Sequence, residues 1–169
     1  MGDMPNNSQN NQNEVYISLL EKSLEKKAVY LDELIKLTEE QETLIAAGKL
    51  EDDRFDSIID SKNELIKKID ELDGGFEQIY QRVKAELISN PEGYRAHIEE
   101  LKELITDVTD KGVRLQVMER RNRDRIELYL RSKRDSIRNF KVNSKTASKY
   151  YSSFNKIGKD DSYFFDEKK

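Results

Sequence analysis

Apolar residues recur at helical spacing throughout residues 91–141. Steps of three and four residues place them on one stripe of an α-helix, because 3.6 residues make a turn. Unbroken, this helix would be about 75 Å long at 1.5 Å per residue, with Asn90 as N-cap and Pro91 as first helical residue. Such a helix needs partners, since one apolar edge does not stabilise it alone in water. The stripe consists of Tyr94, Ile98, Leu101, Ile105, Val108, Leu115, Met118, Ile126, Tyr129 and Leu130.

Two earlier segments, residues 14–47 and 53–88, carry the same kind of pattern. The first has Ile17, Leu24, Leu31, Thr38 and Ile45 at intervals of seven, and the second has Phe55, Ile69, Phe76 and Val83 at multiples of seven. Short connections at 48–52 and 89–93 force antiparallel neighbours. The sequence therefore predicts an all-α fold: an elongated antiparallel three-helix bundle or coiled coil, in which the basic end of the long third helix extends past the other two.

The pair Gly74–Gly75 lies inside the second helical segment. Two glycines cost a helix about 2 kcal/mol relative to alanine. The apolar series nevertheless continues across them in the same register. This favours a kinked continuous helix, and the alternative is a turn followed by a separate short helix.

The two ends of the chain differ from the middle. Residues 1–13 are rich in Asn and Gln, which predicts a flexible tail. Residues 143–157 form a short amphipathic pattern, and the stretch after it carries Tyr163, Phe164 and Phe165. We therefore divide the chain into a tail (1–13), a helical bundle (14–142) and a mobile segment with a short C-terminal helix and an aromatic tail (143–169). That last segment could cap the bundle or bind a partner.

Composition agrees with long solvent-exposed helices around a thin core. Of the 169 residues, 38% are charged and 36% apolar, and there is no Cys. The missing thiols exclude disulfides and cysteine chemistry. No apolar run approaches the roughly 20 residues of a membrane span, and the start lacks a signal pattern. The sequence predicts a soluble intracellular protein.

Charge is distributed unevenly along the chain. Residues 1–110 carry a net −13 and residues 111–149 a net +9. The basic part could pair with the acidic part across the bundle, or it could bind an acidic partner. Clustered Arg also raises the question of nucleic acid. We expect none, because the adjacent acidic helices would repel phosphates.

Catalytic chemistry has little to work with. His97 is the only histidine, so it is expected to be a partly packed polar residue. Neighbouring carboxylates such as Asp52 and Asp53 lack an apolar pocket that would raise a pKa, and helix caps or solvated faces explain them better. We expect no enzyme, no metal site and no cofactor.

Several stretches together resemble one protein family. They are ETLIAAGKLEDDRF (42–55), LQVMERRNRDRIELYL (115–130), SKTASKYY (144–151) and FFDEKK (164–169), with Arg121–Asn122 followed by Ile126 and Leu130 as the most specific local match. In these features the chain resembles the FlgN-type flagellar export chaperones.

The resemblance implies a cytoplasmic chaperone of the flagellar type III export system. Such a protein binds the C-terminal helices of hook-associated (hook–filament junction) proteins and prevents their premature assembly. It delivers them to the export gate, and meets the membrane only through the export apparatus. The resemblance also implies a tyrosine that takes part in gate docking, and Tyr150 or Tyr151 is the nearest counterpart.

An overhanging amphipathic helix end suits a mode in which a partner's helix completes the bundle. In this hypothesis Arg121 and Arg125 steer an acidic client helix, and Asn122 belongs to the same motif. The other expected contacts are Ile126, Tyr129, Leu130, Ile137, Phe140, Tyr150, Tyr151 and Phe154. Two alternatives remain: a coiled-coil scaffold or adaptor that self-associates through the same stripe, and a chaperone of the filament-cap type.

Overall fold

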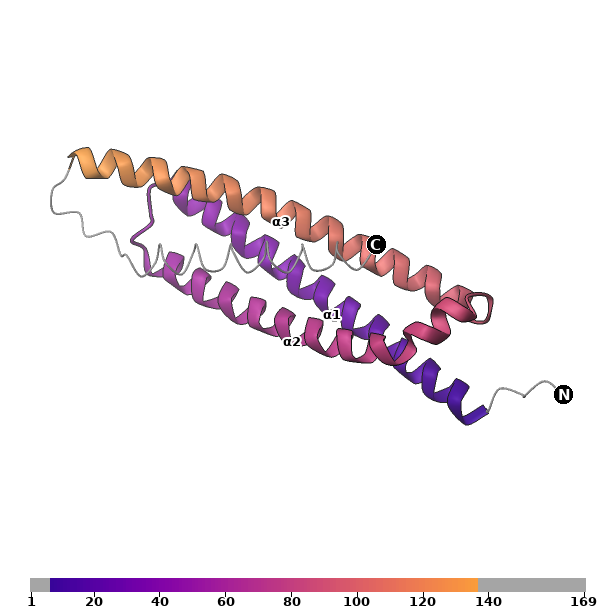
Figure 1. Cartoon of the computed structure of the whole chain (residues 1–169). Coiled ribbons are helices and arrows are strands. Elements are labelled where there is room, and N and C mark those ends of the chain that lie inside the picture. The colour runs from indigo at the N-terminus through magenta and orange to yellow at the C-terminus, as the bar shows by residue number, and fades with distance from the viewer. Residues whose placement is uncertain (1–6, 137–169) are drawn as a thin grey trace.

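The computed structural model describes residues 7–136, and every regular element there is helical. The elements are α1 (Asn7–Ala46), α2 (Asp53–Ser89), the short 3-10 helix η1 (Glu92–Tyr94) and α3 (Arg95–Ser136). The all-α prediction is confirmed for this part of the chain. Figure 1 shows α1 running between α2 and α3. Both pack against α1, while the backbones of α2 and α3 stay apart over most of their length.

The turn between α1 and α2 is built as the sequence predicts. Gly48 adopts φ 70°, a left-handed conformation that favours glycine. The amide of Lys49 donates to the carbonyl of Leu44 (2.8 Å) and that of Gly48 to Ile45 (3.0 Å), which is a Schellman motif. Asp52 then caps α2 by accepting from the amide of Arg54 (2.8 Å). The chain therefore reverses direction within a few residues.

The start of α1 corrects the expected boundary at Glu14. The helix begins at Asn7, so residues 7–13, which we assigned to a tail, are helical. Once a long helix has nucleated, adding a turn costs little even for Asn and Gln. Local contacts also favour the extension, since Gln12 donates to the Tyr16 hydroxyl (3.0 Å) and Asn13 is buried.

The glycine pair does not interrupt α2. The helix runs without a break from Asp53 to Ser89, which confirms the continuous reading over the broken one. In Figure 1 α2 bends toward the start of α3 in its C-terminal part. Paired small residues are a common cause of such bends.

The start of the third helix also differs from the prediction. Pro91 is followed by η1, and α-helical geometry begins only at Arg95. Asn90 closes α2, and its Oδ1 accepts from the amide of Gly93 (3.3 Å). The side chain of Asn90 thus serves the connecting turn, which delays the α-helix by one turn.

The far end of α3 extends past the turn that joins α1 and α2, as Figure 1 shows in orange. This agrees with the expected overhang. Residues 137–141 of the expected helix, the short C-terminal helix and the aromatic tail lie outside the described residues.

The buried apolar side chains form two clusters. A main cluster runs along all three helices, from Ile17 and Val83 to Leu115 and Met118. A smaller one, here called the turn-end cluster, sits beneath the α1–α2 turn. Its buried members are Ile45, Leu50, Phe55, Ile59 and Ile126.

Candidate partner-binding site

A buried polar layer separates the two apolar clusters. Its members come from all three helices: Thr38, Gln41, Lys62, Glu119 and Asn122, each at most 1% exposed. On every helix these residues fall between the two clusters. The flanking apolar residues are Ile35 and Ile45 on α1, Ile59 and Leu65 on α2, and Met118 and Ile126 on α3.

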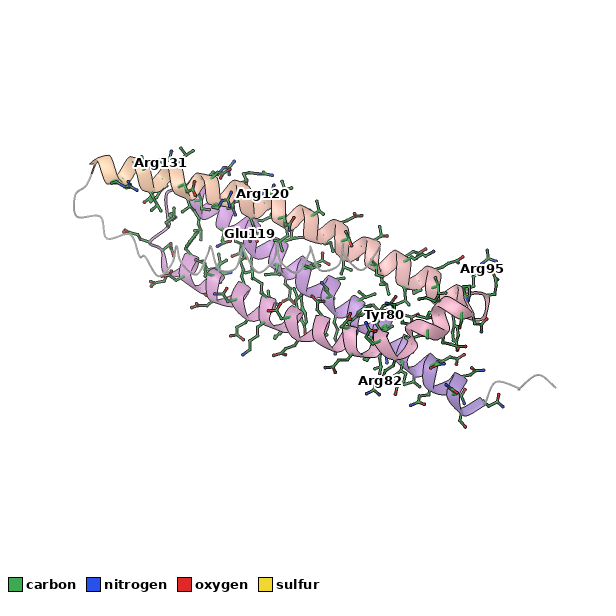
Figure 2. The ribbon with its side chains drawn as sticks, viewed as in Figure 1. Tyr80, Arg82, Arg95, Glu119, Arg120 and Arg131 are labelled. Carbon is green, nitrogen blue, oxygen red and sulfur yellow. The ribbon has the colours of Figure 1, made fainter. Side chains whose placement is uncertain are left out.

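Lys62 holds the polar layer together. Its ammonium donates to Gln41 Oε1 (2.7 Å) and forms an ion pair with Glu119 Oε1. The Thr38 hydroxyl lies within hydrogen-bonding distance of the same carboxylate oxygen (3.2 Å). Figure 2 shows Glu119 on the side of α3 that faces the other helices. The layer therefore connects α2 to α3 although their backbones are apart.

Burying the polar layer costs free energy, which offsets part of what its hydrogen bonds and ion pair contribute to stability. Burial lowers the pKa of Lys62, and the neighbouring Glu119 carboxylate opposes that shift. Gln41 Nε2 and Asn122 Oδ1 have no hydrogen-bond partner in the part of the chain that the structure describes. Because buried polar groups without partners destabilise a fold, this layer is better suited to fixing register than to adding stability.

Asn122 belongs to this layer and not to an open surface. Its Nδ2 donates to the carbonyl of Thr38 (3.2 Å). Ile126, one turn further, is 3% exposed in the turn-end cluster. In this conformation neither residue is available to a client, contrary to our expectation. Both fix the base of the overhanging end.

The two arginines expected to steer a client already have a partner within the chain. Arg125 Nη1 lies 3.0 Å and Arg121 Nη1 3.5 Å from Glu42 Oε1 on α1. Further along the same seam Arg114 pairs with Glu39 (3.1 Å) and Lys111 with Asp32 (3.1 Å). This supports pairing of the basic and acidic parts across the bundle.

Tyr129 and Leu130 lie where α3 passes the turn. Both are half-buried against the turn-end cluster. The Tyr129 hydroxyl donates to the carbonyl of Gly48 (3.4 Å), and the Lys133 ammonium lies 5.7 Å from the ring centroid. Tyr129 therefore anchors the overhang to the turn while leaving part of its ring in solvent.

Leu128 was not among the expected contacts, yet its side chain is 65% exposed. Arg131, which Figure 2 places on the outer side of α3, is also exposed and forms no ion pair with the side chains of residues 7–134. The expected contacts Ile137, Phe140, Tyr150, Tyr151 and Phe154 lie outside the described residues. The described part of the overhang thus presents Leu128, Tyr129, Leu130 and Arg131.

His97, the only histidine of the sequence, has a structural role. His97 Nδ1 lies 2.9 Å from Glu21 Oε1, and the side chain is partly packed, as expected. Within residues 7–136 no three potential metal ligands cluster, and no helix is long and apolar enough to cross a bilayer.

The sequence contains a signal for the polar layer that the predictions above missed. Lys62 is the polar member of the seven-residue series Phe55, Ile69, Phe76 and Val83, and Asn122 follows Leu115 by seven. Gln41 likewise follows Leu34 by seven. Three polar interruptions at seam positions, one on each helix, indicate residues that meet.

A family model described as FlgN protein matches residues 16–155, which span all of α2 and α3 and most of α1. The chain belongs to the FlgN family. FlgN proteins are flagellar export chaperones, a family not known for enzymes, and hook-associated proteins are the kind of partner they bind. No curated protein and no solved structure matches the chain significantly.

Membership of the FlgN family fits the geometry in one particular respect. The match extends beyond Ser136, so the family pattern includes the overhang as well as the bundle. A chaperone needs an exposed apolar surface and no catalytic centre, and the described helices carry apolar surface at Leu128.

Proposed function

We propose that this FlgN-family protein is a cytoplasmic chaperone that binds the C-terminal helices of hook-associated proteins through the overhanging end of α3. It keeps those helices from assembling early and delivers them to the membrane export gate. The observation that supports this placement is that α3 continues past the α1–α2 turn with Leu128 65% exposed.

The overhang suits a helical client for a physical reason. In this mode of recognition an amphipathic helix places its apolar face in a groove between helices. Its contact residues are spaced three or four apart along its sequence. Tyr129 and Leu130 already have one side packed on the turn-end cluster, so the other side offers a preformed apolar edge. Arg131 would meet an acidic residue of the client at the rim, a role we had given to Arg121 and Arg125. The expected contacts Ile137, Phe140, Tyr150, Tyr151 and Phe154 would extend the same surface.

Calorimetric titration of the full chain with the C-terminal helix of a hook-associated protein tests the function. We expect binding, and at least a tenfold loss with Leu128→Glu, since a carboxylate would enter an apolar contact. Val117→Glu is the matched control, because Val117 is 53% exposed on α3 but lies beside the bundle. Absence of binding to any hook-associated segment would contradict the function. Equal loss in both variants would contradict the placement.

Truncation after Ser132 examines the rest of the proposed surface. The variant removes Ile137, Phe140 and the three aromatic contacts beyond them. We expect weaker binding of the same client helix, with the bundle's helical signal retained. An unchanged affinity would restrict the client contact to the residues before Ser132.

A further inference from the structure

A second apolar surface lies on the opposite side of α1 from α3. It is a solvent-open groove of about 270 Å³ between residues 19–26 of α1 and residues 71–79 of α2. We call it the α1–α2 groove. It is lined by Leu19, Lys22, Ser23 and Lys26 of α1 and by Glu71, Leu72, Gly75, Phe76 and Ile79 of α2.

The lining of the α1–α2 groove suits apolar side chains of a partner and not a small molecule. Leu72, Phe76 and Ile79 give it an apolar floor, and Leu19 at one edge is 42% exposed. Sites for small ligands are commonly larger, about 300–1,000 Å³, and enclose convergent polar groups. The volume here accommodates a few side chains projecting from a helix.

The chain's own packing does not require glycine at either position of the Gly74–Gly75 pair. Neither has a positive φ, and a Cβ built on either meets nothing within 4 Å. Alanine at each would stabilise the helix by about 1 kcal/mol. A bend could use either glycine, but only Gly75 lines the groove. Its missing side chain keeps the floor open to the close approach of another backbone.

The α1 edge of the groove is positively charged. Lys22 and Lys26 stand one turn apart on the α1 edge, and neither forms an ion pair within residues 7–136. On the other side of α1, Glu21 and Asp32 are paired with α3. Glu71 on the α2 edge is the only acidic residue in the lining. A partner would therefore place carboxylates beside α1.

We propose that the α1–α2 groove docks an amphipathic helix of a partner protein, with its apolar stripe on Leu72, Phe76 and Ile79 and its carboxylates toward Lys22 and Lys26. This site is separate from the proposed client surface. Tyr129 packs at Gly48, which lies 22 residues beyond Lys26, or roughly 30 Å along α1 at 1.5 Å per residue. The function proposed above has the chain bind a client and deliver it, and two surfaces would let it hold two partners at once.

The test uses two synthetic helical peptides with the same leucine stripe, one flanked by glutamates and one by lysines. Amide shifts of the isotope-labelled full chain report where each binds. We expect the glutamate peptide to shift Leu72, Phe76 and Ile79, and the lysine peptide to bind at least tenfold more weakly. Lys22→Glu with Lys26→Glu should reverse this preference.

The matched pair Gly75→Leu and Gly74→Leu separates docking from helix stability. Both replace an exposed glycine of α2 with a good helix former, so both should raise thermal stability. Only Gly75→Leu should fill the groove and weaken the glutamate peptide at least tenfold. Equal binding by the two variants would overturn the proposal. So would self-association of the wild type that Gly75→Leu abolishes, since the occupant would then be a second copy.

Discussion

The two sides of α1 differ in how their edges are covered by the neighbouring helix. Toward α3, its edge is closed by exposed ion pairs: Lys111–Asp32, Arg114–Glu39 and Arg125–Glu42. Toward α2, the largely buried pair Lys27–Asp73 (2.9 Å) lies next to an open apolar groove. Much of the charge asymmetry of the sequence is thus used in ion pairs within the chain. A basic stretch is therefore weak evidence for a partner until its internal pairs are known.

The polar layer connects α2 to α3, which lie on the two sides of α1. Substitutions in this layer should have the largest effect on the free energy of unfolding. Glu119→Ala leaves Lys62 buried without its ion-pair partner, so we expect a loss of about 3–5 kcal/mol in unfolding free energy. The double variant Lys62→Met with Glu119→Leu should be neutral or more stable, by up to about 4 kcal/mol. Urea unfolding measures both. A double variant clearly less stable than the wild type would show that the layer contributes net stability.

The same layer should make stability depend on pH. Burial lowers the pKa of Lys62 in the folded state below 10.5, so the unfolded chain binds more protons between the folded value and 10.5. The stability of the wild type relative to the double variant should therefore rise with pH across that window and fall as pH drops through the folded pKa. Urea unfolding at a series of alkaline pH values measures the difference. A constant difference would contradict the shift.

Two leucines of α3 contrast the buried seam with the overhang. Leu115 is fully buried in the main cluster, so Leu115→Ala should cost about 2–5 kcal/mol. Leu128 is 65% exposed, so Leu128→Ala should change stability by no more than about 0.5 kcal/mol. Thermal unfolding distinguishes them. Comparable losses would mean that Leu128 is covered in solution.

A small effect is also expected at the rim of the α1–α3 seam. The side chains of Arg114 and Glu39 are 63% and 53% exposed, so Glu39→Gln should cost only about 0.2–1 kcal/mol. The loss should shrink at high salt because exposed charges are screened. Urea unfolding at low and high ionic strength measures it. A larger loss that salt does not reduce would mean that this seam depends on its ion pairs more than exposure suggests.

The existence and approximate bounds of the three helices were predictable from the sequence. Apolar residues at intervals of seven, such as Ile17, Leu24 and Leu31, indicate which residues share a helix face. The short connection at 48–52 and a capping role for Asp52 were predicted as well. The start at Asn7 was missed because a few neutral polar residues extend a helix at little cost. The 3-10 turn before Arg95 was missed because Asn90 serves the turn with its side chain.

The candidate site was less predictable for one physical reason. Apolar residues at regular spacing identify the face of a helix that is buried. They do not show which neighbouring helix or turn covers each part of that face. Ile126 and Asn122 share the face of Tyr129. The turn-end cluster buries Ile126 and the polar layer buries Asn122, whereas Tyr129 stays half-exposed. Arg121 and Arg125 were likewise assigned to a client because their distance to Glu42 depends on the register between α1 and α3.

Hydrogen exchange of the full chain with and without a client helix tests the central claim directly. The account predicts that the C-terminal helix of a hook-associated protein slows exchange in α3 beyond Ile126. The polar layer and the main cluster should exchange as before, since they are already closed. Protection confined to other parts of the bundle, with α3 beyond Ile126 unchanged, would contradict the overhang as the client surface.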